Sequence, residues 1–497
     1  MLYFAPSRLS ASSGFSAAGQ WKHLRRYLTQ TVLPYSPYYA DKATSWPEAA
    51  RAPQSLTDFQ RIPFTTKTDL VDAVAAKRIR DFVLQPDPEH IRRKPAVIWD
   101  AVRHGRTTAR QHVEQEFRPV MMTSTTGRSA APVPFFYTRY DLNNLARSGI
   151  TLCETFDTHS DDRIVNVFPY APHLAFWQVT FATMAFTVFH IGTGGGKTMG
   201  THGNLQLINT VQPTALVGMP TFLYHLLHLA EEQGLQFTQL RNVILGGEKA
   251  PQGLRKKLKE LLAAVGSPDA RIMATYGFTE ARMAWAECPS TDGTTPTGYH
   301  LPPGLAHVEI IDPQTGEVLP EGHPGEIVFT PLDGRGIVVL RYRTGDRING
   351  GLVTGTCPHC GRMSQRLVGK ISRVSEQRAL QLDKLKGTLV DFNTLEHLLD
   401  DQPDVGSWCV ELRKANDDPH ELDELILHVQ ARSLNGHKTL ARTLERRCRS
   451  LLEISPNHVA FHSPEAMRKL LGVGTELKEK RLIDNRPKAP VTQEESS

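Results

Sequence analysis

The sequence predicts an α/β protein with a large N-terminal domain, a β-rich subdomain and a small α+β domain at the C-terminus. Between residues 160 and 280, apolar runs such as Ile164 to Phe168, Ala215 to Met219 and Val243 to Leu245 alternate with amphipathic stretches. Alternation of this kind indicates a mostly parallel sheet covered by helices. Residues 305–345 instead show strand–turn–strand patterning, which predicts a separate β-rich unit.

Four segments are expected from this patterning. Residues 1–118 form a helical part of the large domain, and residues 119–304 form its α/β core. Residues 305–372 form the β-rich subdomain, and residues 373–497 form the C-terminal domain, with a helix around Asn393 to Leu399. The stretch 75–118 carries the basic run Arg92-Arg-Lys and has no assigned role.

Composition is that of a soluble globular chain. The 497 residues are 40% hydrophobic and 22% charged, and the net charge of +5 is small for this size. The most apolar stretch, Leu174 to Ile191, contains glutamine, threonine and histidine, which favours a buried helix over a membrane span. We expect a cytoplasmic protein with neither nucleic acid nor a membrane as partner. Its oligomeric state is open, with a homodimer as one option.

The first 40 residues have no Asp or Glu and carry several basic side chains. This pattern fits either a transit peptide or an ordinary basic first helix. Six cysteines in so long a chain do not make a disulfide scaffold, so the Cys357-Pro-His-Cys360 pair predicts a metal-binding or redox-active knuckle.

A turn rich in hydroxyl groups at 123–128 is a candidate phosphate-binding loop. Small side chains expose backbone N–H groups there, and a concavity of this kind suits a polyphosphate. Its members are Thr123, Ser124, Thr125, Thr126, Gly127 and Arg128. A solvent-exposed loop is the structural alternative. A second candidate, Gly194 to Thr198, lacks the first glycine of a P-loop, because Ile191 occupies that position.

Further short motifs follow the loop in a defined order along most of the chain. They are Tyr137-Thr-Arg-Tyr-Asp141, Gly246-Gly-Glu248, Tyr276-Gly-Phe-Thr-Glu280, Glu287-Cys288, Gly325-Glu326, Arg341-Tyr-Arg-Thr-Gly-Asp346 and a polar loop with Lys478, and Pro63-Phe-Thr-Thr-Lys67 precedes them. In these motifs and their order the chain resembles the phenylacetate-CoA ligase family of the adenylate-forming superfamily.

The resemblance implies a two-step reaction. Family members join a carboxylate to the α-phosphate of ATP and then pass the acyl group to the thiol of coenzyme A, using Mg²⁺ and a mobile C-terminal domain. Three alternatives stay open: a carrier-protein thiol or another acceptor in place of coenzyme A, an adenylyltransferase that leaves AMP on its product, and a nucleotide-binding protein without turnover.

The resemblance also implies roles for individual residues. Lys478 is the adenylation lysine, with Lys480 as rival, Glu280 holds Mg²⁺ and Thr279 donates to the α-phosphate. The nucleotide site adds Gly246, Gly247, Glu248, Tyr276, Gly277, Asp346 for the ribose, and Arg366 with Arg362 as substitute. The acid pocket, expected to take an aromatic acid, draws on Tyr170, His173, Phe176 and Trp177. Hydrogen-bonded or packed structural residues are the alternative for His173 and Tyr276.

A structural zinc site is also expected, because some relatives pair a knuckle with an upstream Glu-Cys and Gly-x-His. The four ligands would be Cys288, His300, Cys357 and Cys360, with His359 as an alternative. Two features depart from the family pattern. Ser124 and Arg128 stand where relatives carry glycine and lysine, and no acidic hinge follows Gly369-Lys370.

Overall fold

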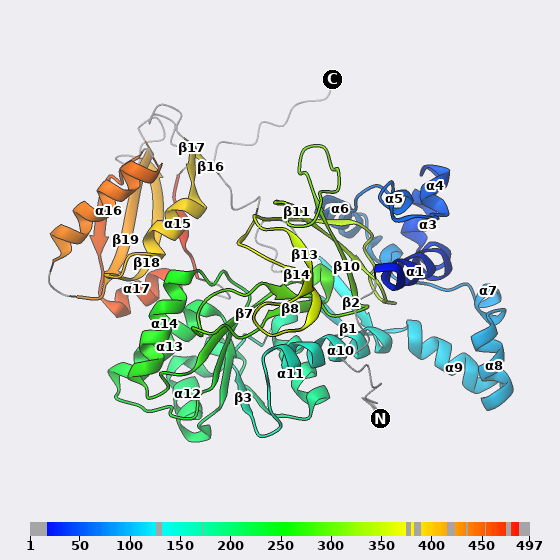
Figure 1. The fold of residues 1–497 in the computed structure, drawn as a ribbon, viewed down its shortest axis with the longest axis horizontal. Helices are drawn as coiled ribbons and strands as arrows, with labels where there is room; N and C mark the ends of the chain where they lie inside the picture. Colours follow the sequence, from blue (N-terminus) through cyan, green and yellow to red (C-terminus); the bar gives the residue numbers. More distant parts are fainter. Residues whose placement is uncertain are drawn as a thin grey trace.

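The fold is layered, with helices on both faces of a large sheet and a separate domain at the C-terminus (Figure 1). The computed structural model describes residues 17–125, 132–170, 172–373, 379–381, 389–414, 423–433, 436–452, 454–473 and 479–486. Within these ranges the α/β class predicted from the strand–helix alternation is confirmed.

The central sheet has nine strands in the order β13-β14-β9-β8-β7-β6-β5-β3-β4. The strands from β7 to β4 are parallel, and the four from β13 to β8 are antiparallel. Their bounds are β3 (Arg163–Asn166), β4 (Phe189–Gly192), β5 (Ala215–Gly218), β6 (Asn242–Leu245), β7 (Arg271–Phe278), β8 (Met283–Glu287), β9 (Tyr299–His300), β13 (Leu352–Thr356) and β14 (Met363–Leu367).

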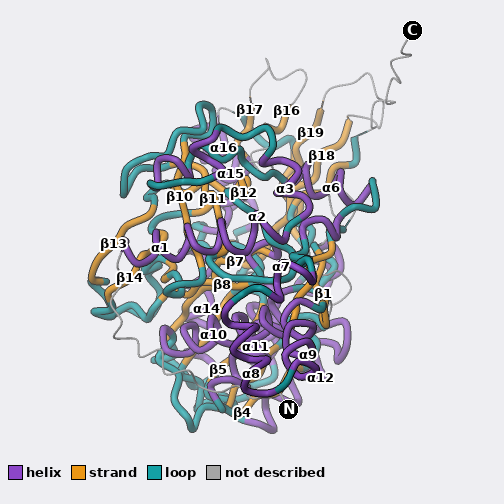
Figure 2. Tube along the Cα trace, turned by 90° about the vertical axis from the view of Figure 1, so that its right-hand side faces the viewer, coloured by secondary structure: helices purple, strands orange, loops and turns teal. Residues whose placement is uncertain are grey.

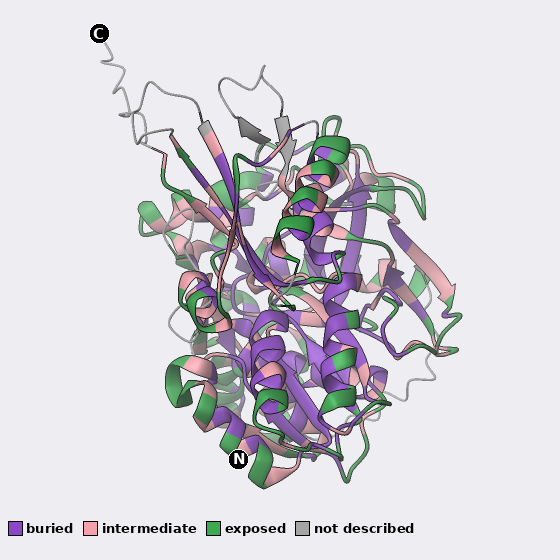
Figure 3. Ribbon diagram, turned by 90° about the vertical axis from the view of Figure 1, so that its left-hand side faces the viewer, coloured by how far each residue is buried: buried purple, intermediate pink, exposed green. Residues whose placement is uncertain are grey.

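Helices cover both faces of the parallel part. Alternate strand residues point to opposite faces, so Val165 and Leu216 pack with α12, α13 and α14, whereas Ile164 and Val217 pack with α10 and α11. The inner strands β5 and β6 are buried along their whole length, whereas the edge strand β4 is partly exposed; Figure 3 colours the chain by burial. The helices are α10 (Arg139–Thr155), α11 (Leu174–Phe186), α12 (Gly195–Val211), α13 (Pro220–Glu232) and α14 (Gln252–Ala264).

The segment 305–372 divides between two sheets. A four-stranded antiparallel sheet has the order β10-β11-β12-β15, formed by β10 (Ala306–Ile311), β11 (Gly325–Pro331), β12 (Tyr342–Ile348) and β15 (Ile371–Arg373). The hairpin β13–β14 instead extends the nine-stranded sheet through β9. A two-stranded hairpin, β1 (Pro119–Ser124) with β2 (Pro134–Thr138), completes the large domain.

The N-terminal helices pack against the four-stranded sheet, and Figure 2 views the molecule from their side. They are α1 (Ala17–Tyr27), a π-helix (Leu28–Val32), α2 (Leu33–Tyr35), α3 (Pro37–Ala43), α4 (Glu48–Arg51), α5 (Leu56–Phe59), α6 (Lys67–Ala75), a 3₁₀ turn (Ile79–Phe82), α7 (Pro88–Arg92), α8 (Pro95–His104) and α9 (Arg106–Phe117). The previously unassigned stretch 75–118 thus includes a projecting hairpin, α8 with α9 (Figure 1).

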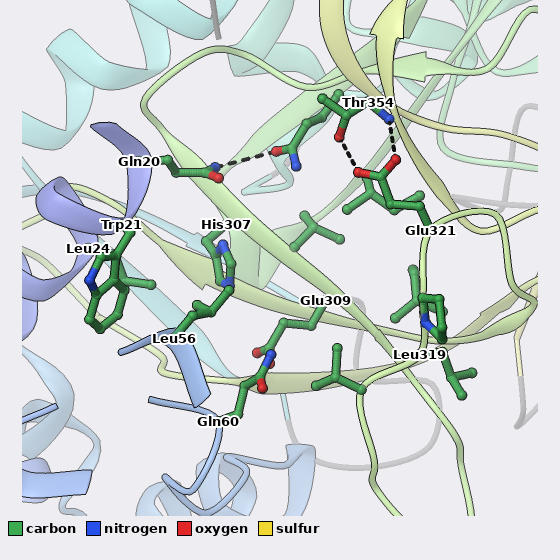
Figure 4. Close-up of a pocket in the computed structure, with 16 residues that line it drawn as sticks. Gln20, Trp21, Leu24, Leu56, Gln60, His307, Glu309, Leu319, Glu321 and Thr354 are labelled. Atoms are coloured by element: carbon green, nitrogen blue, oxygen red, sulfur yellow. Dashed lines mark hydrogen bonds between the residues drawn. The ribbon is translucent and has the colours of Figure 1, made fainter. Parts of the chain in front are cut away.

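A cavity of about 300 Å³ lies between α1, α5 and the four-stranded sheet (Figure 4). Its wall includes His307 and Glu309 of β10. Glu309 accepts two hydrogen bonds of 3.1 Å from the buried guanidinium of Arg341, which also donates to the backbone oxygen of Ile62 at 2.8 Å. These contacts anchor the start of β12 to the N-terminal helices.

The C-terminal domain is an α+β unit, as predicted. Its sheet has the order β20-β19-β18-β21, formed by β18 (Val405–Lys414), β19 (Asp423–Ala431), β20 (His458–Phe461) and β21 (Leu482–Asp484). Its helices are α15 (Phe392–Asp400), α16 (His437–Leu452) and α17 (Pro464–Leu471), and a short pair, β16 (Ala379–Gln381) with β17 (Leu389–Asp391), precedes them. Among the described residues, no helix has the length and apolar character to cross a membrane.

Candidate functional site

Two tyrosine–carboxylate hydrogen bonds join the end of β7 to β12. The Tyr276 hydroxyl donates to Asp346 Oδ2 at 2.7 Å, and the Tyr342 hydroxyl donates to Glu280 Oε1 at 2.8 Å. Glu280 lies with Thr279 in a 3₁₀ turn (Thr279–Ala281) directly after β7. The structure therefore brings together three predicted site residues, Tyr276, Glu280 and Asp346, although Tyr276 and Asp346 are 70 positions apart in the chain. The two hydrogen bonds fix the orientation of both carboxylates.

Tyr276 is half-buried in an aromatic cluster. Its ring centroid lies 5.5 Å from Trp285, 5.7 Å from Tyr299 and 5.8 Å from Phe278. Tyr276 thus packs among aromatic side chains while its hydroxyl reaches Asp346, and its role in the nucleotide site stays a prediction. The next residue, Gly277, is exposed.

The Gly-Gly-Glu motif follows β6 at the carboxyl edge of the parallel strands. Gly246 leaves no room for a side chain, because a Cβ there would collide with the Thr275 hydroxyl, and Gly247 has a φ of +78°. Glu248 Oε2 accepts a hydrogen bond of 2.6 Å from Thr221 at the start of α13. Ligands of open α/β sheets bind at this edge.

The predicted phosphate loop begins in the β1–β2 hairpin. Thr123 is buried and its hydroxyl lies 3.2 Å from that of Tyr137, so its side chain belongs to the hairpin core. The Thr125 hydroxyl accepts from the backbone N–H of Val133 at 3.0 Å. Thr126, Gly127 and Arg128 lie outside the described residues.

Aromatic side chains gather where the acid pocket is expected. The ring centroids of Tyr170 and Phe176 are 5.2 Å apart, and those of Phe176 and Trp177 are 5.5 Å apart, both edge to face. Tyr170 is 65% exposed. His173 Nδ1 lies 3.1 Å from the backbone oxygen of Ser124, a contact that links this cluster to the phosphate loop, and a role of His173 in the acid pocket stays a prediction.

The two arginine candidates lie apart from these contacts. Arg366 is buried in β14 opposite His300, and its Nε has no hydrogen-bond partner in the described part of the chain. Arg362, the substitute, donates to the backbone oxygen of Glu154 at the end of α10. This contact holds Arg362 at the end of α10, and the nucleotide role of Arg366 stays a prediction.

Four predicted zinc ligands converge. The ligand atoms of Cys288, His300, Cys357 and Cys360 all lie within 4.8 Å of one another. Cys288 Sγ is 3.8 Å from Cys357 Sγ, and Cys360 Sγ is 3.7 Å from His300 Nε2. His359, the alternative ligand, is exposed and is not part of the cluster.

The donor set suits a closed tetrahedral metal site. His300 Nδ1 is 2.8 Å from the Ser364 hydroxyl, which orients Nε2 toward the cysteines. Hydrogen bonds from Cys288 and His300 hold the pKa of the Cys360 thiol below its usual range, which favours the thiolate that binds metals. The cluster joins the end of β8, β9 and the turn of the β13–β14 hairpin.

Lys478 lies outside the described residues, and its catalytic role stays a prediction. The chain is described again from Glu479. Lys480 is exposed, and its backbone N–H donates to Leu471 at 3.0 Å.

Comparison with known proteins finds similarity to one group of enzymes. A model of the AMP-binding enzyme family matches residues 92–332. The phenylacetate-coenzyme A ligase of Pseudomonas putida is 28% identical over 262 residues, and that of Aromatoleum evansii is 29% identical over 308 residues. Over the matched regions the chain is similar to AMP-binding enzymes and to phenylacetate-coenzyme A ligases. The two alignments cover 52% and 59% of this chain, but only 55% and 62% of those relatives.

Solved structures show the same fold. A 2-hydroxyisobutyryl-CoA ligase in its postadenylation state, in complex with R3-HIB-AMP, has a TM-score of 0.72 at 18% identity, covering 98% of this chain and 95% of that one. The same ligase in its thioesterification state, with 2-HIB-AMP and CoA, has a TM-score of 0.59 at 19% identity, covering 95% and 91%.

Sequence reasoning did not assign roles to Thr221, His225, Tyr342 and Glu479. Tyr342 lies four positions before Asp346 in the Arg341–Asp346 motif. Because alternate residues of a strand share one face, this spacing could have suggested that Tyr342 lies near the site. Thr221 follows the end of β5, and the neighbouring strand β6 ends just before Gly246, which could have suggested that Thr221 lies near the Gly-Gly-Glu motif. No signal in the sequence pairs His225 with Glu479, because that contact depends on how the C-terminal domain packs.

Proposed function

We propose that the protein uses ATP to activate a carboxylic acid as its acyl-adenylate and then transfers the acyl group to coenzyme A. The single observation that carries this proposal is the pair of hydrogen bonds that holds Glu280 and Asp346 at the junction of β7 and β12. Asp346 would accept the ribose hydroxyls, and Glu280 would hold Mg²⁺ through its oxygens.

In the first half-reaction, an oxygen of the carboxylate attacks the α-phosphorus of ATP. The bond from that phosphorus to the bridging oxygen breaks, and pyrophosphate leaves. Thr279 donates to the α-phosphate and the Lys478 ammonium bridges the attacking carboxylate and the phosphate, so both stabilise the charge that grows there. Bound Mg²⁺ would supply further positive charge on the phosphate oxygens.

In the second half-reaction, the sulfur of coenzyme A attacks the acyl carbon after its proton has passed to solvent. The bond between that carbon and the phosphate oxygen breaks, and AMP leaves. The C-terminal domain must change its orientation between the two steps. We assign the orientation in this structure to the stage of adenylate formation, supported by the higher TM-score against the postadenylation state of the hydroxyisobutyryl-CoA ligase.

The substrate class we propose is a compact aromatic acid. Phe176 packs against Gly192, where a Cβ would lie 2.9 Å from its ring, and the rings of Tyr170 and Trp177 lie beside it, so these side chains would supply the flat walls of an acid pocket. Such a surface favours a planar apolar group over a branched or charged one.

We also propose a structural Zn²⁺ at the four-ligand cluster. With Zn–S bonds of about 2.3 Å and tetrahedral angles, two ligand sulfurs lie about 3.8 Å apart, which matches the 3.8 Å between Cys288 and Cys357. The ion would tie the β13–β14 hairpin to β8 and β9.

Mass spectrometry of the products tests the main proposal. The full chain is incubated with ATP, Mg²⁺, coenzyme A and a mixture of aromatic carboxylates, and an acyl-CoA with equimolar AMP is expected. AMP attached to the organic product would make the protein an adenylyltransferase instead. The absence of AMP and pyrophosphate with every acid would refute turnover.

A further inference from the structure

The C-terminal domain packs against α13 and α14 of the large domain (Figure 1). A Cβ added to Gly253 in α14 would lie far inside van der Waals distance of the backbone oxygen of Asp400, at the end of α15. The two helices therefore meet at a point where only glycine fits.

A buried carboxylate crosses this interface. Glu479 reaches His225 of α13, with 3.2 Å between Oε1 and Nε2, and the two side chains are only 6% and 2% exposed. Arg481 Nε lies 3.4 Å from Glu479 Oε2. Burial alone would raise the pKa of Glu479, but His225 and Arg481 outweigh it and the pKa is lowered. The carboxylate therefore stays charged inside the interface.

This charge depends on its partners. Neither carboxylate oxygen of Glu479 has good hydrogen-bond geometry with a described residue, so the pairs with His225 and Arg481 supply most of the compensation for burial. A buried charge that loses its partner is strongly destabilised. A rotation of the C-terminal domain that separated Glu479 from His225 would expose the carboxylate to water. Such a rotation would break the contact without leaving a buried, unpaired charge.

Two more ion pairs complement the contact. Lys249 Nζ lies 3.3 Å from Glu396 Oε2, and Arg432 of the C-terminal domain pairs with Glu260 of α14. Charges of opposite sign thus face each other across the interface. Such pairs favour one relative orientation of the two domains more than they strengthen the contact between them.

We propose that Glu479 is a positioning residue whose buried contact with His225 holds the C-terminal domain in the orientation for adenylate formation. This inference rests on the proposed function, because that orientation has a role only if an adenylate is made. Glu479 directly follows Lys478 in the chain, so the anchor acts one residue from the proposed catalytic ammonium. A contact made in one half-reaction and broken in the other affects the two steps differently.

The first test is structural and needs no substrate. Hydrogen–deuterium exchange of α13 is compared between the full-length wild type, Glu479→Gln and Gly253→Ala. Glu479→Gln removes the charge, and Gly253→Ala inserts a methyl group against Asp400 while keeping every charged side chain. Gly203→Ala is the matched control, since a Cβ at this helical position would meet only Met199 of the same helix, at 3.4 Å. Faster exchange of residues 220–232 is expected in both interface variants but not in the control. Unchanged exchange would show that the contact does not hold the domain.

The second test separates the half-reactions. It measures acid-dependent ATP–pyrophosphate exchange with a panel of aromatic acids, and thioester formation from the corresponding synthetic acyl-adenylates and coenzyme A. Exchange should fall about tenfold in both interface variants, a typical size for coupling through domain equilibria, while thioester formation stays equal or rises. Equal losses in both steps would overturn the positioning role. If the wild type shows no ATP–pyrophosphate exchange, the proposed function is refuted and the positioning role with it. The hydrogen–deuterium exchange of α13 would still show whether the contact holds the two domains together.

Discussion

Removal of the knuckle cysteines, Cys357 and Cys360, is expected to remove the bound metal and to destabilise the fold. We expect about one zinc ion per chain in the purified wild type, as four ligands form one closed site. Replacing both Cys357 and Cys360 with serine should abolish the metal, because only Cys288 and His300 remain. Metal analysis by mass spectrometry measures this directly on the full chain.

The expected loss of stability follows from the loop that the metal closes. Cys288 and Cys357 are 69 positions apart. If a metal cross-link restricts the unfolded chain as a disulfide does, closing a loop of this length contributes about 4 kcal/mol at 25 °C. The double variant should therefore unfold at lower urea concentration, with a free energy of unfolding reduced by up to about this amount.

The exposed His359 provides a matched control on the same knuckle. His359→Ala should keep both the zinc content and the urea midpoint of the wild type. Loss of zinc in His359→Ala, or a full complement of zinc in the double cysteine variant, would refute the ligand assignment. A metal-free wild type with the same stability as the cysteine variant would refute the site altogether.

Three further predictions concern buried polar groups. Tyr276→Phe should weaken ATP binding about tenfold or more by calorimetry, because a hydrogen bond to the charged Asp346 is lost; unchanged affinity would contradict the site. Arg255→Met should lower the free energy of unfolding by about 3–5 kcal/mol, because Glu287, which is 2.8 Å away and 2% exposed, would stay buried and unpaired. Adding Glu287→Gln to the same chain should restore part of the lost stability. Burial lowers the pKa of Lys257 from 10.5 to about 8, so unfolding takes up a proton between these pH values. Wild-type stability should therefore rise with pH across this window by roughly 3 kcal/mol relative to Lys257→Met, and parallel pH profiles would refute the shift.

The parallel sheet was predictable because its strands are short apolar runs between amphipathic helices, a purely local pattern. The hairpin β13–β14 was expected in the β-rich subdomain, but it extends the central sheet instead. Its position is set by pairing with the two-residue strand Tyr299–His300, and so short a strand leaves no periodicity to detect.

The candidate site was predictable as a set of residues and not as a set of contacts. The resemblance named Glu280 and Asp346, but the hydrogen bonds from Tyr342 and Tyr276 depend on two sheets meeting. The histidine expected in the acid pocket packs on the backbone of Ser124, since its ring can reach that oxygen from the start of α11. The contact of Glu479 lies beyond any motif, because it forms between domains.

Acid-dependent exchange of labelled pyrophosphate into ATP tests the central claim most directly, with Lys478→Ala compared with Lys480→Ala. We predict pyrophosphate exchange by the wild type with at least one aromatic acid. Lys478→Ala should lose about a hundredfold or more of this exchange, because a charge that stabilises the transition state is removed. Lys480→Ala should keep near wild-type exchange. Wild-type exchange in Lys478→Ala would contradict the account.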